Sequence, residues 1–569
     1  MLAIAAVPIA LTSLRTPPPA LQWWTATALE KIRPDDNPPP DLKKDVVLSA
    51  ARNEFEPFQL VLRAVSQQIN DVDIQVSDLT GPQKAVIPKQ NAAIYFEGFL
   101  DLKKPSNIEG RAGEWPDPLI PRVDQYFHEK RNAFPFKLTN NRNQPIWIEF
   151  YVPPSTLAGS YQGNLTVTVQ SKPEISIPIK LQVWNFSLPS TSTLPNSFGF
   201  SGLSAQRQHL GRYTNDADLV ALTVLYEKAA LLHRISIHGG TMRPPVFSRE
   251  GHAHIDWTNY DAEVGPFLDG TVFHTGDPLP GAKATSVELR TSANAETDEL
   301  KIQYWRELAA HFRQKGWFDR LFNYVWDEPR KEDSSALITK ARLVHDADPA
   351  IRNLVTAPLT PAWNAVIDIW TPLINCFERR GGFPPFCDSV VGRSSYDADI
   401  QKGKSLWWYQ SCASHGCYTI GGGYFTGWPS YMIDVSPVAN RIMEWMTWKY
   451  GIQGELYFST VDAYNSDGDP WHDVNRYSGN GDGTLFYPGR PAVIGGKTQI
   501  PVESIRLKLI REGLEDYEYL HMLGSSPVAA EAVNSLVHDL YDFEHDPEKL
   551  YAVRYRMGEE LSKRGGTTN

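Results

Sequence analysis

The sequence predicts a multidomain α/β protein in which an N-terminal β-sandwich precedes a parallel (β/α) barrel with further C-terminal helices. Two observations predict this fold. Residues 23–190 contain short apolar or alternating runs separated by Gly, Pro, Asn and Asp, which is typical of a β-sandwich. After a Pro/Ser/Thr-rich segment at 188–195, strand-like and helix-like runs alternate, which is typical of a parallel barrel.

The composition is that of a globular protein with sizeable cores. The chain has 569 residues, of which 42% are hydrophobic and 21% are charged. Its net charge is −11 and it has no run of Lys and Arg, so nucleic acid is not an expected partner. The 17 tryptophans offer rings that can stack on sugars, although most are expected in the core.

We expect three segments along the chain: a leader at 1–22, the sandwich at 23–190 and the barrel at 191–569. Residues 2–11 are apolar but too few to span a bilayer, and no other stretch is long enough. They resemble the apolar part of a secretory signal without its basic start, so the segment is either a truncated signal or an apolar strand. An extracytoplasmic or secreted protein is therefore expected. The sequence does not indicate an oligomeric state.

The sandwich strands follow from alternation and short apolar runs. Leu165, Val167 and Val169 alternate with polar residues, the period of two that marks a half-buried strand. The expected strands of this domain are 45–48, 58–64, 71–76, 146–152, 164–169 and 175–183.

The barrel region alternates strands with helices. The expected strands are 197–200, 235–238, 321–326, 353–357, 366–370, 405–410 and 454–461, and the expected helices are 219–232, 298–315, 334–345, 437–450 and 502–522. An open doubly wound sheet is the alternative, but no Gly-rich phosphate-binding turn supports it. In the last helix, Arg511 and Glu515 are spaced as an i,i+4 pair, and Gly513 should have a packing reason because glycine weakens a helix.

An adjacent acid pair, Asp327 and Glu328, follows an apolar strand that contains Tyr324 and Trp326. Pro329 ends the strand, so both acids lie where a barrel presents its catalytic groups. Two neighbouring carboxylates repel each other, so one pKa should rise and keep a proton near neutrality. An exposed Asp-Glu that opens a loop is the alternative.

Two other segments are candidates for sugar binding. In the strand at 405–410, alternation puts Trp408 and Gln410 on one face and Trp407 and Tyr409 on the other. We select Trp408 and Gln410 as substrate-binding residues, together with Tyr324 and Trp326, and we add Asp462 and Trp471 from the next strand end and its loop.

No metal or cofactor is expected. Asp467 and Asp469 match no calcium-loop spacing, and the four cysteines match no zinc pattern. The cysteines either form local disulfides or remain free thiols; they are Cys376, Cys387, Cys412 and Cys417.

Several segments, in order, resemble the DUF4091 family, which is related to glycoside hydrolase family 123. The most specific is 501–520, PVESIRLKLIREGLEDYEYL, and the others are 51–59, 407–412, 441–451, 469–471 and 480–489. The resemblance implies an N-terminal β-sandwich, a (β/α)8 catalytic barrel and β-N-acetylgalactosaminidase activity. It maps the family's Asp-Glu pair onto Asp327 and Glu328.

The resemblance also implies a retaining mechanism in which the sugar's 2-acetamido oxygen attacks the anomeric carbon. Asp327 would orient the acetamide, and Glu328 would act as acid and then base. Acids adjacent in sequence do not flank a glycosidic bond as a nucleophile and acid do, which favours this mechanism. Both can reach one site only if the strand ends or bulges there.

Three alternatives stay open. A glycosidase acting on a sugar without the acetamide, or on another linkage, would need a nucleophile, for which Asp462 and Glu378 are candidates. A non-catalytic carbohydrate-binding protein is the second alternative, and a structural surface protein is the third.

Overall fold

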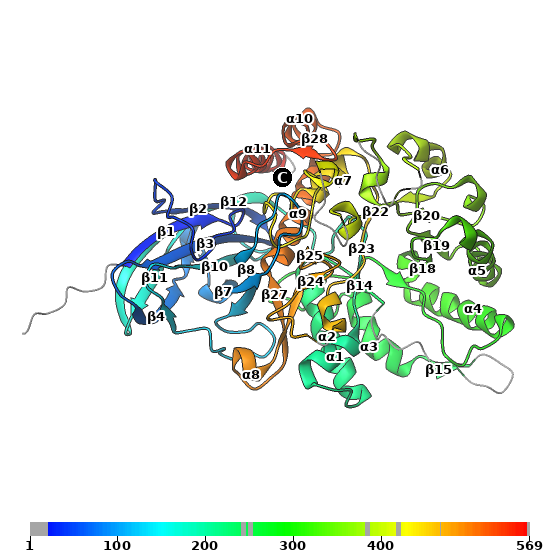
Figure 1. Ribbon diagram of the computed structural model, residues 1–569, viewed down its shortest axis with the longest axis horizontal. Coiled ribbons are helices and arrows are strands. Elements are labelled where there is room, and N and C mark those ends of the chain that lie inside the picture. Colours follow the sequence, from blue (N-terminus) through cyan, green and yellow to red (C-terminus); the bar gives the residue numbers. More distant parts are fainter. Residues whose placement is uncertain are drawn as a thin grey trace, which may run out of the picture.

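The computed structural model describes residues 21–239, 246–247, 254–381, 387, 389–416, 423–466 and 468–565. Figure 1 shows two parts: largely antiparallel sheets built mostly from the N-terminal third, and parallel strands with helices built from the rest. Helix α9 (Ile505–Leu523) lies between them. The expected leader lies almost entirely outside the described residues.

The first sheet of the sandwich is antiparallel and has the order β1-β3-β10-β7-β8-β27-β26. Its last two strands come from the C-terminal third of the chain, and β27 pairs with β8 through Glu503 opposite Leu119. The strands are β1 (Leu21–Thr27), β3 (Glu54–Ala64), β7 (Ala92–Leu102), β8 (Gly113–Pro121), β10 (Asn143–Val152), β26 (Phe486–Gly489) and β27 (Ile500–Ser504).

The second sheet has the order β2-β12-β11-β4-β9, with a short hairpin of β5 and β6 beside β11. Leu165 and Val167 are fully buried in the core between the sheets, as the alternation predicts. The strands are β2 (Val46–Arg52), β4 (Ile69–Val76), β5 (Leu79–Thr80), β6 (Val86–Ile87), β9 (Phe136–Leu138), β11 (Gly159–Val169) and β12 (Lys172–Ser187).

The rest of the chain contains two parallel sheets. One has the order β17-β18-β19-β20-β21 and the other β14-β13-β23-β22. Their strands are β13 (Asn196–Gly199), β14 (Ile237–His238), β17 (Val287–Glu288), β18 (Leu321–Trp326), β19 (Arg352–Val355), β20 (Ile369–Trp370), β21 (Ser405–Leu406), β22 (Trp408–Tyr409) and β23 (Glu455–Tyr457).

The strand pairing does not confirm a closed (β/α)8 barrel. At one junction the sheets are continuous, because segment 405–409 pairs first with β20 and then with β23 on either side of Trp407. At the other junction, between β14 and β17, no backbone ladder is formed by the described residues. Side chains bridge the junction instead: Ser236 Oγ accepts from the Thr285 backbone amide at 2.7 Å and lies 3.0 Å from Thr285 Oγ1.

The ends of the main helices follow from the sequence. Helix α4 begins after Thr297, whose side chain caps the Leu300 amide, and ends at Gly316 in the left-handed region. The helices are α1 (Gly202–Leu210), α2 (Asp216–Leu232), α3 (Thr258–Asp269), α4 (Asp298–Lys315), α5 (Ser334–Ala347), α6 (Asp397–Gln401), α7 (Met443–Lys449), α8 (Pro491–Ile494), α10 (Pro527–Leu536) and α11 (Pro547–Gly565). The barrel pattern is irregular, because only a 3-10 turn, Pro361–Trp363, lies between β19 and β20.

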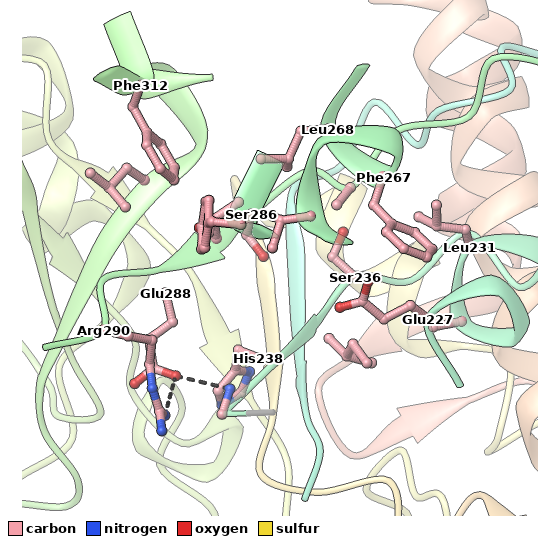
Figure 2. Close-up of a pocket in the computed structure, with 18 of the residues that line it drawn as sticks. Glu227, Leu231, Ser236, His238, Phe267, Leu268, Ser286, Glu288, Arg290 and Phe312 are labelled. Atoms are coloured by element: carbon pink, nitrogen blue, oxygen red, sulfur yellow. Dashed lines mark hydrogen bonds and ion pairs between the residues drawn. The ribbon is translucent and has the colours of Figure 1, made fainter. Parts of the chain in front are cut away.

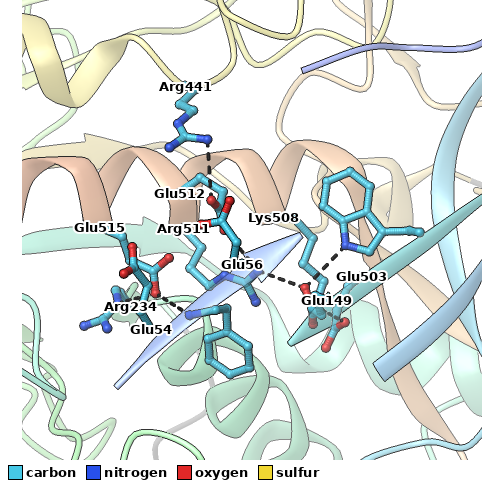
Figure 3. Close-up of polar contacts among 12 residues, drawn as sticks. Glu54, Glu56, Glu149, Arg234, Arg441, Glu503, Lys508, Arg511, Glu512 and Glu515 are labelled. Carbon is cyan, nitrogen blue, oxygen red and sulfur yellow. Dashed lines mark hydrogen bonds and ion pairs between the residues drawn. The ribbon is translucent and has the colours of Figure 1, made fainter. Parts of the chain in front are cut away.

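Buried ion pairs join α9 to the sandwich and to the parallel-sheet region (Figure 3). Arg511 and Lys508 each bind Glu149 of β10 at 2.8 Å, and Glu515 binds Arg234 at 3.1 Å. All five side chains are almost completely removed from solvent. Burying charge is costly unless each group is paired, so this arrangement fixes how α9 sits against both parts.

Candidate active site

The acid pair lies where β18 ends and the chain leaves the parallel sheet. The pairing of β18 with β19 shifts register between Tyr324 and Trp326. Glu328 then adopts a φ of +43°, a left-handed conformation that is unfavourable for a residue with a Cβ. The regular alternation of side chains therefore stops before the acids, and the two are free to serve one site.

Each acid accepts a hydrogen bond from a tyrosine. The Tyr324 hydroxyl, from β18 itself, donates to Asp327 Oδ1 at 2.7 Å. The Tyr409 hydroxyl, from β22, donates to Glu328 Oε1 at 2.6 Å. Two strands that are distant in sequence thus hold the two carboxyl groups.

A threonine from the end of β19 contacts both acids. The Thr356 hydroxyl accepts from the Glu328 amide at 2.6 Å and donates to Asp327 Oδ1 at 3.1 Å. Thr356 is itself buried, with 4% exposure. It therefore fixes the unusual backbone of Glu328 and the carboxylate of Asp327 together.

The surroundings of Glu328 favour its protonated form. Partial burial raises the pKa of Glu328, and the charge of Asp327 raises it further, while the hydrogen bond from Tyr409 opposes the rise. Burial and the nearby carboxylates raise the pKa values of Tyr324 and Tyr409 well above 10, so both remain donors. A carboxyl group with a raised pKa is suited to donate a proton as a general acid and to take one back as a base.

Tyr409 and Thr356 were not among the residues selected from the sequence. Alternation placed Tyr409 on the face opposite Trp408 and Gln410, but it did not indicate which face meets the acids. The phenol of Tyr409 was the available signal, since a buried hydroxyl needs a partner and a strand-end acid can supply it.

Trp408 and Gln410 are not brought to the acid pair. Trp408 is completely buried and its Nε1 donates to Thr447 Oγ1 of α7 at 3.0 Å, so its face of the strand turns toward the helices. Gln410 is also buried, and its Oε1 lies 3.0 Å from His415 Nε2. The hydroxyl of Tyr409 on the opposite face reaches Glu328 instead, and substrate binding by Trp408 and Gln410 stays a prediction.

Trp326, Asp462 and Trp471 also make contacts apart from the acids. The Lys340 ammonium of α5 lies 4.3 Å from the centroid of the Trp326 ring. Asp462 pairs with Arg476 at 2.7 Å. Trp471 donates from Nε1 to the Pro488 carbonyl at 2.9 Å and packs near the sandwich. Of the expected substrate-binding residues that the structure describes, Tyr324 is the one whose side chain forms a hydrogen bond with the pair.

A small cavity of about 60 Å³ lies beside this site, between β14, β17 and the helices α2 to α4. In Figure 2, His238, Glu288 and Arg290 occupy one end of it and Glu227 lies at the other. Glu288 Oε2 accepts from the Gly239 amide at 2.9 Å and from Arg290 at 3.3 Å. The His238 ring meets the Tyr324 ring edge-on at 5.9 Å, so this end of the cavity adjoins the acid pair.

Over the described ranges, no group of three or more His, Cys, Asp or Glu side chains is arranged to hold a metal ion. In the same ranges, no helix combines the length and apolar character needed to cross a bilayer. Cys376 and Cys387 form a disulfide and Cys412 is also disulfide-bonded, whereas Cys417 and Asp467 lie outside the described residues.

Comparison with known proteins gives two family matches. Residues 282–523 match the catalytic domain of glycoside hydrolase 123, and residues 26–169 match the N-terminal domain of the same family. The catalytic match contains both acids. A search of curated proteins found no match.

A solved structure shares the fold of this chain. The structure of a family 123 glycoside hydrolase from Clostridium perfringens, described for glycolipid glycan hydrolysis, is 14% identical, with a TM-score of 0.64 over 96% of this chain and 98% of that one. A family 39 glycoside hydrolase from Bacteroides cellulosilyticus is 10% identical and has a TM-score of 0.32, covering 85% of this chain and 83% of its own.

Proposed function

The chain belongs to glycoside hydrolase family 123, and we propose that it releases terminal β-linked N-acetylgalactosamine from glycans by a retaining, substrate-assisted mechanism. The observation that carries the proposal is that two neighbouring acids have different surroundings. Asp327 is anchored by two hydroxyl groups, while the pKa of Glu328 is raised. The glycolipid glycan named for the Clostridium protein is the kind of substrate that such a site would serve.

In the first step, Glu328 gives its proton to the glycosidic oxygen as the bond from that oxygen to the anomeric carbon breaks. The acetamide oxygen of the substrate forms the new bond to this carbon and closes an oxazolinium ring. Both hydrogen bonds to Asp327 go to Oδ1, and no described residue donates to Oδ2. Oδ2 can therefore accept from the acetamide N–H and stabilise its positive charge.

In the second step, the Glu328 carboxylate takes a proton from water, and the oxygen of that water attacks the anomeric carbon. The bond to the acetamide oxygen breaks, so the sugar leaves with its β configuration and the acetamide is restored. The hydroxyl of Tyr409 stabilises the carboxylate form of Glu328 between the two steps.

The contacts of the alternative nucleophiles favour this mechanism over a conventional one. Asp462 is paired with Arg476. Glu378 Oε2 accepts from the Tyr450 hydroxyl at 3.4 Å and from the Leu540 amide at 3.2 Å, near the C-terminal hairpin of β28 (Val537–Asp539) and β29 (Asp542–Phe543). Neither carboxylate is joined to the acid pair by a hydrogen bond.

Hydrolysis of 4-nitrophenyl β-glycosides tests the proposal. We expect release from the N-acetylgalactosaminide and not from the galactoside, which lacks the acetamide. Glu328→Gln and Asp327→Asn should each lower kcat by about 10²-fold to 10⁴-fold. Glu378→Gln is the matched control and should keep wild-type kcat. Turnover of the galactoside would mean that the protein supplies the nucleophile, and would overturn the assisted mechanism. Turnover of the N-acetylglucosaminide in place of the N-acetylgalactosaminide would mean that the released sugar is N-acetylglucosamine.

The proposal also covers the architecture of the catalytic domain and the location of the protein. We infer that the two parallel sheets work as one irregular (β/α)8 barrel, which is supported by their continuity at β21 and β22. We also propose an extracytoplasmic location, supported by the Cys376–Cys387 disulfide. Labelling of free thiols in unreduced protein from its native cells tests the location, since a cytoplasmic protein would present these thiols to the reagent.

A further inference from the structure

A groove of about 430 Å³ runs between the sandwich and α11, away from the acid pair. Its walls come from β1, β2 and β3 on one side and from α11 on the other. Figure 1 shows α11 lying along the sandwich close to β2 and β12. The volume is in the range of sites that hold small molecules, about 300–1,000 Å³.

The floor of the groove carries a buried carboxylate with an unused oxygen. Glu56 is 3% exposed and its Oε2 accepts from Arg554 Nη1 at 3.0 Å. Arg554 also binds Glu54 and Asp516, so one guanidinium serves three carboxylates. No described residue donates to Glu56 Oε1. The floor therefore presents a hydrogen-bond acceptor in acidic surroundings.

The walls add apolar surface and the rim adds charge. Tyr555 is 44% exposed and Val47 is 69% exposed, and both line the groove. At the rim, Lys43 and Glu548 form an ion pair of 2.9 Å between the loop before β2 and the start of α11. Since Lys43 is paired and Arg554 is saturated, the groove has no free cation among its described lining residues.

We propose that this groove is a second, non-catalytic binding site for a neutral sugar residue. A sugar ring has an apolar C–H face that packs on Tyr555 and Val47, and hydroxyl groups that donate to acceptors such as Glu56 Oε1. Both cations of the described lining are paired with carboxyl groups, so no free cation there would balance an anionic ligand. The choice of a carbohydrate rests on the proposed function, whereas the groove, its acceptor and its apolar walls do not.

Hydrogen–deuterium exchange of the full chain with N-acetylgalactosamine as the probe tests the site, because it reports each region separately. We expect the sugar to slow exchange in the groove segments 43–58 and 547–555 and, independently, in the acid-pair segment 321–330. Val47→Arg places a long side chain in the groove and should abolish protection of the groove segments alone. Val86→Arg is the matched control, since Val86 is a 50% exposed valine on β6 of the same sandwich, and it should leave both effects intact.

The outcomes separate the two proposals. Protection of the groove without protection of 321–330 supports the second site and counts against the proposed function. Protection of 321–330 alone, or groove protection that survives Val47→Arg, overturns the second site. Equal protection of the groove by choline in place of the sugar would show a site for organic cations and would also overturn it.

Discussion

Replacing Gly513 by alanine should destabilise the protein, although alanine is normally the better helix former. Gly513 lies in the middle of α9. A Cβ at this position would overlap the carboxylate of Glu444 and lie 2.8 Å from the carbonyl oxygen of Arg441, where ordinary contacts begin at 3.4 Å. Glu444 is completely buried, so its carboxylate has little room to move away. The close approach of two chain segments is the packing reason for this glycine.

The magnitude follows from two opposing terms. Alanine gains about 0.5–1 kcal/mol over glycine within a helix. Forcing an extra methyl group into a filled interior costs about 1–3 kcal/mol, and the upper half applies because the Arg441 contact is with backbone. The net loss in the free energy of unfolding should be about 1–2.5 kcal/mol.

Gly392→Ala provides the control, because Gly392 has φ −62° and ψ 153°, a conformation that alanine adopts readily. A Cβ there would meet only the Phe377 carbonyl oxygen at 4.0 Å, an ordinary contact, so this variant should keep the stability of the wild type or gain up to about 1 kcal/mol. Urea unfolding followed by tryptophan fluorescence compares both variants with the wild type. The reasoning is refuted if Gly513→Ala is as stable as the wild type, or if both substitutions shift the midpoint in the same direction.

Three further substitutions test the site and the buried charges. Tyr409→Phe removes a hydrogen bond that lowers the pKa of Glu328, so the alkaline limb of the kcat/KM profile should move to higher pH; an unmoved limb would contradict this. Arg554→Met leaves three buried carboxylates without their shared cation and should cost about 3–5 kcal/mol in urea unfolding, whereas a loss below 1 kcal/mol would show that the network contributes little. Burial raises the pKa of Glu227 from 4.5 to about 8, so its stabilising contribution is complete below pH 4.5 and is lost as the pH rises through 8. Glu227→Gln should therefore reduce the loss of stability between pH 4.5 and pH 8. Thermal unfolding at several pH values measures this loss, and a loss equal to that of the wild type would contradict the prediction.

Many helices and strands could be predicted because the residues that begin and end them are close together in the sequence. The expected helix 298–315 matches α4, whose cap, first-turn acids and terminal glycine are all adjacent in sequence. The expected strand 321–326 matches β18, since Pro329 stops the run soon after it. The position of the acid pair at a strand end followed from the same signals.

Contacts between distant segments could not be predicted in the same way. Arg511 and Glu515 have the spacing of a helical pair, yet Arg511 binds Glu149 and Glu515 binds Arg234. Charges on a helix normally indicate a solvated face, whereas those of α9 are buried against other parts of the chain. The ion pair of Glu54 with Arg554 joins residues 500 positions apart, a separation over which periodicity carries no information.

The residues that surround the acid pair could not be predicted either, because they too come from distant strands. A strand pattern defines two faces but not which one faces the ligand, so Tyr409 and Trp408 were equivalent until neighbouring strands were placed. Thr356 gave no signal of its own, because a threonine at a strand end is common. Its role depends on the register shift between β18 and β19, which depends on both strands.

The completion of a sandwich sheet by β26 and β27 has a consequence for how the protein is made. A ribosome-bound chain that has emerged only through residue 190 lacks both strands, and β8 then exposes an unpaired backbone edge to other nascent chains. That edge is covered only after residue 504 has been synthesised. Recombinant fragments that end at the linker will share this exposed edge, so we expect the N-terminal domain to aggregate when expressed alone and to be soluble when residues 486–504 are supplied.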